Sequence, residues 1–162
     1  MVSDPIIDAI KRGLDDMALQ DIRRASEGKA KMGAFILGSC FIEYLAGFRY
    51  GKKTTRRDYK NFVEQYLGPF YDAEKLYSDL RCKLVHNYSE GGSYIFVDAK
   101  PELHGKRYND KVLVNLENFT DDLERAMRKL FSEIDSDPEI QALAKRRYAK
   151  LGILTVFSIQ PD

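Results

Sequence analysis

The segment RCKLVHNY, residues 81–88, places an arginine, a histidine and a tyrosine at short spacing just before a pair of glycines. An arginine guanidinium presents a fixed fork of N–H donors that matches phosphate oxygens. A histidine imidazole titrates near neutrality, so it can take a proton from a 2′-hydroxyl or give one to a leaving 5′-oxygen. Arg81 and His86 together therefore have the chemistry for metal-independent cleavage of RNA with formation of a cyclic phosphate.

The spacing of these residues does not suit a regular helix. Residues five apart in an α-helix point roughly 140° away from each other, so Arg81 and His86 do not share a face, whereas Arg81 and Tyr88, seven apart, nearly align. Two geometries bring the arginine and the histidine together. Either the helix unwinds near residue 86, or a second copy of the chain supplies the missing group across a symmetric interface.

The same residues are also consistent with a purely structural role. His86 can cap the last carbonyls of a helix, a position that the helix dipole favours for histidine. Arg81 can pair with Asp79, Glu43 or another acid. Tyr88 can pack in the core with its hydroxyl hydrogen-bonded.

Glu43 follows directly after the longest apolar run of the chain, MGAFILGSCFI, residues 32–42. A carboxylate in such a helix is costly to bury unless it is paired. Where the second and fourth predicted helices lie side by side, Glu43 can meet Arg81 and orient it, or influence the protonation of His86. The alternative is that Glu43 marks the solvated edge of its helix.

Two clusters of basic residues could steer RNA phosphates, or could simply be solvated. The first is KKTTRR, with Lys52, Lys53, Arg56 and Arg57. The second, near the C-terminus, contains Lys145, Arg146, Arg147 and Lys150. The second histidine, His104, lies in a turn-rich loop and would complete an acid–base pair only if it reached His86.

The composition is that of an ordinary globular protein, with 162 residues, 44% hydrophobic and 31% charged residues, and a formal net charge of +1. This length favours a single domain, residues 1–162. The charge balance requires no polyanionic partner, so any nucleic acid would bind a local patch. Cys40 and Cys82 lack the spacing of a metal site, and we expect them to be buried thiols, with no metal and no cofactor. Free thiols and the short apolar run predict a cytoplasmic protein without a membrane span.

Apolar periodicity and helix start and stop signals predict a mainly α fold. The predicted helices cover about residues 4–26, with a break near Gly13, then 29–49, 55–67, 73–88, 118–134 and 135–152. Asp4, Thr54 or Thr55, Asp72, and Asn118 or Thr120 are the expected N-caps. The segments SYIFVD and KVLVNL predict two antiparallel strands. The expected fold is therefore an up-and-down bundle of four to six helices with a small antiparallel β-hairpin, about residues 93–116, inserted after helix four. The segment 153–160 is expected to be a strand or an extended packing segment.

The helical pattern together with Arg81, four intervening residues, His86, one residue and Tyr88 resembles the HEPN superfamily. The resemblance covers residues 29–90, and the β insertion and the C-terminal tail lie outside the minimal bundle of that family. It implies a homodimeric ribonuclease in which two such motifs meet at the interface, with Arg81 and His86 catalytic. The added tyrosine is similar to HEPN toxins paired with a nucleotidyltransferase antitoxin, which implies that Tyr88 accepts nucleotide or orients the site. The residue after the arginine, commonly asparagine in active members, is Cys82 here. A non-catalytic HEPN-like domain that dimerises or binds a protein partner is the alternative.

Overall fold

The computed structural model of the chain describes residues 4–87 and 92–151. The elements follow in the order α1 (Pro5–Arg12), η1 (Gly13–Leu19), α2 (Gln20–Glu27), α3 (Lys31–Tyr50), α4 (Arg56–Tyr66), α5 (Ala73–Leu76), η2 (Tyr77–Leu84), α6 (Val85–Asn87), β1 (Tyr94–Val97), η3 (Pro101–Leu103), β2 (Arg107–Tyr108), β3 (Lys111–Asn115), α7 (Leu116–Ser136) and α8 (Pro138–Leu151). The mainly α fold with a small β insertion is confirmed. Tyr88 and the predicted segment 153–160 lie outside the described residues.

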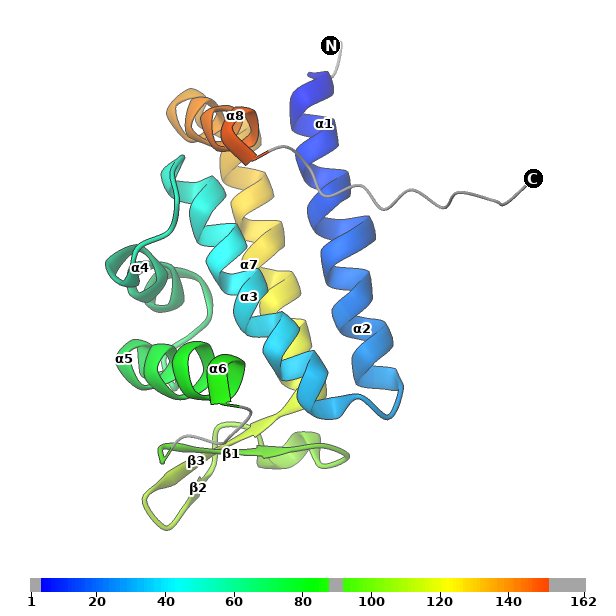
Figure 1. The fold of residues 1–162 in the computed structure, drawn as a ribbon, viewed down its shortest axis with the longest axis vertical. Helices are drawn as coiled ribbons and strands as arrows, with labels where there is room; N and C mark the ends of the chain where they lie inside the picture. Colours follow the sequence, from blue (N-terminus) through cyan, green and yellow to red (C-terminus); the bar gives the residue numbers. More distant parts are fainter. Residues whose placement is uncertain (1–3, 88–91, 152–162) are drawn as a thin grey trace, which may run out of the picture.

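Helix α3 is the centre of the bundle (Figure 1). It packs against α2, α4, α7 and α8. Figure 1 shows α1, η1 and α2 as one continuous rod on one side of α3, and α4 with the rod of α5, η2 and α6 on the other. The sheet lies at the end where α3 begins, and α8 crosses the end where α3 finishes. The sheet therefore returns the chain so that α7 runs in the same direction as α3.

The composition of α3 follows from this central position. Among the described helices, α3 alone has the length and mean hydropathy that a membrane span requires. Ten of its twenty residues are buried inside the bundle, which accounts for the apolar residues on its inner side but not for exposed Leu37 and Cys40. Gly38 permits the approach of α7, because a Cβ at this position would lie 2.6 Å from a ring carbon of Phe119.

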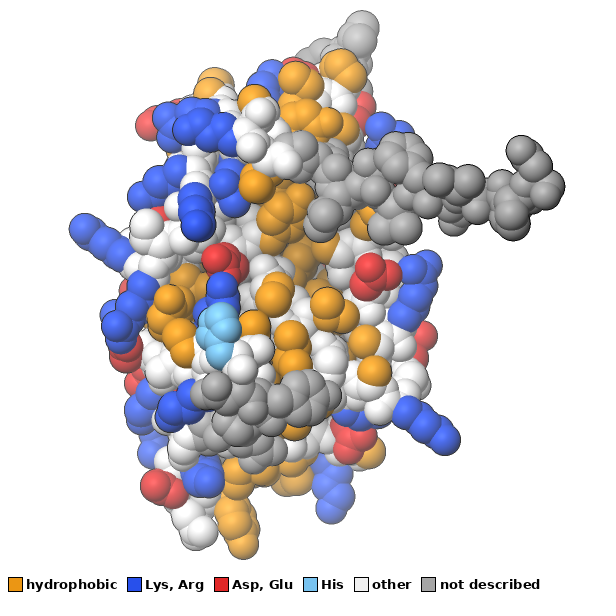
Figure 2. Space-filling model, viewed as in Figure 1, with side chains coloured by type: hydrophobic (Ala, Val, Ile, Leu, Met, Phe, Trp, Pro, Cys, Tyr) orange, Lys and Arg blue, Asp and Glu red, His pale blue; other side chains and the backbone are white. Residues whose placement is uncertain are grey.

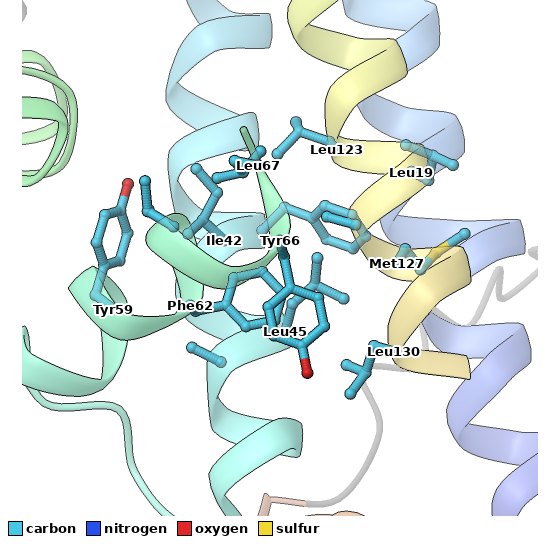
Figure 3. Packing of buried hydrophobic residues seen from close by; sticks show 14 of the residues in the cluster. Leu19, Ile42, Leu45, Tyr59, Phe62, Tyr66, Leu67, Leu123, Met127 and Leu130 are labelled. Carbon is cyan, nitrogen blue, oxygen red and sulfur yellow. The ribbon is translucent and has the colours of Figure 1, made fainter. Parts of the chain in front are cut away.

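The core between α3, α4 and α7 is built from large side chains. Figure 3 shows Phe62 and Tyr66 of α4 directed toward Leu45 of α3 and toward Met127 and Leu130 of α7. All but Tyr66 are fully buried, and Tyr66 is 9% exposed. Burial of such side chains is the main term that holds the helices together. This core fixes α3, the helix that carries Glu43.

Three of the predicted helix starts are confirmed, and one is wrong. Asp4 accepts from the N–H of Ile6, and Asp72 accepts from the N–H of Lys75. Thr55 forms a reciprocal capping box with Asp58. Helix α7 is capped by Asn115 instead of Asn118 or Thr120. Asn115 is the last residue of β3 and has an extended backbone, and its side chain accepts the N–H of Asn118 in the first turn of α7. No loop therefore separates the strand from the helix.

The pairing of the two predicted strands also differs from the prediction. β1 and β3 are parallel, with Tyr94 opposite Val112, and the sheet order is β1-β3-β2. The antiparallel partner of β3 is the short strand β2, which precedes it across a turn where Asn109 has a φ of 56°. β2 occupies one edge of β3, so β1 pairs with the other edge, where it runs parallel to β3.

Two stretches predicted as ordinary helix have the wider π geometry. The first, η1, begins at Gly13, where the sequence predicts a break. The second, η2, covers Tyr77–Leu84 and contains Arg81. In a π-helix each N–H bonds to the carbonyl five residues earlier, so a turn contains more residues than in an α-helix. The rods stay continuous, but the faces on which their side chains lie are shifted.

Candidate functional site

The π geometry of η2 brings Arg81 and His86 together within one chain. The N–H of Val85 donates to the carbonyl of Leu80, five residues earlier. With this pitch, residues five apart come onto nearly the same face, and Nη1 of Arg81 lies 3.3 Å from Nε2 of His86. The contact therefore needs neither an unwound helix end at residue 86 nor a second copy of the chain. Helical π turns occur frequently at functional sites.

Glu43 completes the group from the neighbouring helix. Nε of Arg81 donates to Oε2 of Glu43, across the contact between η2 and α3. Burial alone would lower the pKa of Arg81, but the Glu43 carboxylate outweighs this effect and the pKa is raised. Arg81 is thus held in place as a permanent cation. Among the described residues, Nη2 of Arg81 has no hydrogen-bond partner, so this side of the guanidinium is free to bind an anion.

His86 lies on the surface beside this ion pair. Its side chain is exposed, whereas the side chains of Arg81 and Glu43 are only 24% and 32% exposed. Figure 2 shows a histidine on this face of the molecule, next to a basic and an acidic side chain. A guanidinium can only donate, so Nε2 of His86 accepts and the neutral imidazole carries its proton on Nδ1. Nε2 is therefore the nitrogen that could later take a proton.

The wall behind Arg81 is formed by Tyr77 and Cys40. Tyr77 lies one turn before Arg81, and its ring packs edge-on against Tyr59 with centroids 5.2 Å apart. Burial raises the pKa of the Tyr77 phenol and of the Cys40 thiol, so both stay protonated near neutral pH. The prediction that both cysteines are buried is wrong, because Cys40 is exposed and Cys82 is half-buried. Cys40 faces outward because α3 continues its apolar composition onto its solvent side.

The basic residues 52–57 divide into paired and unpaired side chains. Nζ of Lys52 lies 3.1 Å from Asp58, and Arg56 forms an ion pair with Glu74. Arg56 also lies over the ring of Tyr77, with its Cζ 5.5 Å from the centroid, so this cluster borders the site. Lys53 and Arg57 are exposed and have no ion-pair partner within the part of the chain that the structure describes. Sequence reasoning missed Tyr77, although its position four residues before Arg81 was the available signal.

His104 does not join His86. Its Nε2 lies 3.0 Å from Oδ2 of Asp122, and its Nδ1 accepts the backbone N–H of Asn115 at 3.0 Å. The hydroxyl of Tyr71 donates to the same carboxylate oxygen at 2.6 Å. Burial and the nearby charge of Arg125 lower the pKa of His104 to about 4. Both ring nitrogens are occupied, so His104 fastens the β insertion to α7.

The site is therefore a surface group of a carboxylate, a guanidinium and an imidazole. Within residues 4–87 and 92–151, no three His, Cys, Asp or Glu side chains are arranged to hold a metal ion. Tyr88, the fourth predicted site residue, lies outside the described residues. Comparisons with protein-family models, with curated proteins and with solved structures find no match for this chain.

Proposed function

We propose that this protein is a HEPN-like, metal-independent endoribonuclease that acts as a homodimer in the cytoplasm, in a defence or toxin–antitoxin setting. The observation that carries the proposal is the 3.3 Å contact between Nη1 of Arg81 and Nε2 of His86 at the surface. It supplies one phosphate-binding group and one proton-transfer group at a single position. Glu43 holds the guanidinium from behind, which preorganises it for an anion.

The chemistry follows from the two groups. A phosphodiester that binds Arg81 draws the Nη1–H onto its oxygen and leaves the lone pair of His86 Nε2 free. The imidazole then takes the proton of the 2′-hydroxyl while the 2′-oxygen attacks phosphorus. Arg81 stabilises the added negative charge of the five-coordinate phosphorus. The bond to the 5′-oxygen breaks, that oxygen takes up a proton, and the products are a 2′,3′-cyclic phosphate and a 5′-hydroxyl.

The dimer proposal is supported by an apolar stripe beside the site. Leu37 is 42% exposed, Cys40 is exposed, and Tyr44 is half-buried, at successive turns of α3. Figure 2 shows hydrophobic side chains running along this face next to the histidine. An exposed apolar stripe of this kind is typical of a protein–protein interface. In this proposal, a second copy on the stripe supplies the second His86, which protonates the leaving oxygen.

The same stripe supports a second candidate function. A non-catalytic HEPN-like domain would use the apolar face of α3 to dimerise or to bind a protein partner, with Arg81 and Glu43 as a structural ion pair. A nucleotidyltransferase antitoxin, with Tyr88 as the acceptor of nucleotide, is the partner that the HEPN resemblance implies for the catalytic alternative.

The first test is cleavage of single-stranded RNA in the presence of EDTA. We expect the wild type to yield products with 2′,3′-cyclic phosphate ends and His86→Ala to lose at least 100-fold in rate, because general acid–base groups contribute on this scale. The exposed residue Arg24, which among the described residues forms an ion pair with Asp21 of α2 alone, provides the control variant Arg24→Ala. Equal rates for wild type and His86→Ala would remove the imidazole from the reaction, and no cleavage by either would favour the non-catalytic candidate.

A further inference from the structure

A second arginine reaches the same face of α3 from the far end of the chain. Helix α8 crosses α3 at Gly47, where a Cβ would lie 2.9 Å from Nε of Arg147 and 3.2 Å from Oγ1 of Thr54. The missing side chain thus lets Arg147 lie directly on the backbone of α3. Gly47 is four residues after Glu43, so the two positions share a face and lie about 6 Å apart along the helix axis.

Arg147 lacks the partners that its neighbours have. Lys145 pairs with Asp4, and Arg146 donates to the carbonyl of Gly51 at 2.9 Å. Nε of Arg147 is buried and has no hydrogen-bond partner among the described residues, and no carboxylate of those residues lies within ion-pair distance. The Nε edge of the guanidinium thus packs against α3 at Gly47, and the positive charge of Arg147 is not compensated by a carboxylate of the described residues.

Arg147 also lies near Tyr44, the residue next to Glu43 on α3. Burial raises the pKa of the Tyr44 phenol, and the charge of Arg147 opposes that rise, so the cation lies close to the residue next to Glu43. Thr54 links the two positions, because its hydroxyl donates to the carbonyl of Glu43 at 2.6 Å. Figure 2 shows basic side chains gathered on this face above the histidine, on the side of α8.

We propose that Arg147 binds the phosphate adjacent to the one held by Arg81 on a single strand of RNA. The proposal rests on the proposed function for the identity of the first phosphate. Arg81 is bound at Glu43 and Arg147 packs on Gly47, positions that are one turn apart on α3, so in this proposal the two guanidinium groups serve neighbouring phosphates of one strand. Arg147 acts here as a positioning residue of the substrate and takes no part in proton transfer. Half-buried Tyr44 and Tyr148 beside it offer ring faces on which a base can stack.

The test compares two 2′-O-methyl oligonucleotides, which carry phosphates but cannot be cleaved by 2′-hydroxyl attack. One is a dinucleotide with a single phosphodiester, and the other is a trinucleotide with two. We expect the wild type to bind the trinucleotide about tenfold more tightly. Arg147→Gln should lose this gain while binding the dinucleotide as the wild type does. The dependence of log Kd on log salt for the trinucleotide should decrease by about 0.7.

The control variant is Lys150→Gln, an exposed charge on the same helix, which should keep the preference for the trinucleotide. Arg147→Lys retains the charge without the fork and should keep part of the preference, which makes the test independent of whether Arg147→Gln folds. Equal weakening of both oligonucleotides in Arg147→Gln would assign the side chain to packing alone. A wild type without preference, or a variant that keeps it, would also overturn the proposal.

These binding measurements separate the two proposals, because they require no cleavage. Loss of preference in Arg147→Gln together with no cleavage of RNA by the wild type would support the phosphate site and contradict the nuclease. Cleavage that depends on His86, with an unchanged preference in Arg147→Gln, would leave the nuclease standing and reject the role of Arg147.

Discussion

At the scale of single residues, the site depends on which partner each N–H group of the Arg81 guanidinium contacts. Arg81 gives Nε to Glu43 and directs Nη1 toward His86, while Nη2 has no acceptor among the described residues. Glu43 comes from the most buried helix, so it cannot follow movements of the surface. The orientation of Arg81 is thereby set by the core and not by the exposed end of α6.

We expect Glu43→Gln to keep the shape of this contact and remove its charge. The free energy of unfolding of the variant should be about 1 kcal/mol lower than that of the wild type, as is typical for loss of a half-exposed charged hydrogen bond. The variant should also cleave RNA about tenfold more slowly, because Arg81 is less firmly oriented. Urea denaturation and cleavage rates measure the two effects. Asp21→Asn, which removes the exposed partner of Arg24, is the control and should change stability by less than about 0.5 kcal/mol. An equal change in both variants would contradict the assigned role of Glu43.

The residues of this site could be predicted from the sequence, but their arrangement could not. A carboxylate directly after an apolar run needs a partner, and that requirement indicated Arg81 as one of two interpretations of Glu43, the other being a solvated edge of the helix. The contact of Arg81 with His86 depends on the pitch of η2, and eight residues are too few for apolar periodicity to distinguish a π-helix from an α-helix. Neither residue type nor spacing indicates the wider turn.

At the scale of elements, α3 is shaped by where its small residues lie. Gly38 is buried against α7, while Gly33 lies near the start of the helix, where, among the described residues, a Cβ would approach the side chain of Ala30 alone, at 3.7 Å. The two glycines therefore have opposite roles in one helix. Gly38 provides space for Phe119, whereas Gly33 has only the conformational cost of a glycine within a helix.

We expect Gly38→Ala and Gly33→Ala to change stability in opposite directions. The first places a methyl group 2.6 Å from a ring carbon of Phe119 and should lower the free energy of unfolding by about 1–3 kcal/mol. The second should raise it by about 0.5–1 kcal/mol, because alanine favours the helix and restricts the unfolded chain. Chemical denaturation of the two variants gives both values. The close approach of α3 and α7 would be refuted by a Gly38→Ala variant as stable as the wild type.

Helix starts were predictable at the capping residues Asp4, Thr55 and Asp72, but not at Asn115, which also caps its helix. The pairing of the strands was not predictable. Alternation of apolar residues marks a strand but is the same for parallel and antiparallel neighbours. The short strand β2, with only two residues, carried no pattern of its own, and its pairing with β3 decides the position of β1.

At the scale of the whole molecule, a buried polar group around Asp122 is among the contacts that join the β insertion to the bundle. The carboxylate of Asp122 on α7 is contacted by His104 from the insertion and by the hydroxyl of Tyr71 from the segment before α5. Nδ1 of His104 also accepts the N–H of Asn115, the residue that caps α7. The neutral imidazole is therefore the form that fits the folded chain.

This arrangement predicts a loss of stability at mildly acidic pH. The pKa of His104 is about 4 in the folded chain and about 6.5 when unfolded, so between these values the unfolded chain binds a proton that the folded chain does not. Stability should be complete above pH 6.5 and fall by about 3 kcal/mol as the pH approaches 4. Urea denaturation across this range measures the loss.

His104→Gln is the informative comparison, because it keeps a donor and an acceptor but does not titrate. Its free energy of unfolding should decline less steeply between pH 6.5 and 4 than that of the wild type, while His86→Gln, at the exposed histidine, should follow the wild type. Parallel curves for wild type and His104→Gln would show that His104 is not the group responsible.

The wide turn of η2 has a consequence for how the number of residues between two functional groups is interpreted. Residues five apart meet on one face of a coil with i→i+5 bonds, whereas residues four apart do so on an ordinary α-helix. Deletion of one residue between Arg81 and His86 can therefore be compensated by tightening the coil to α-helical pitch. Chains with different counts between arginine and histidine can thus present the same pair of groups to a substrate.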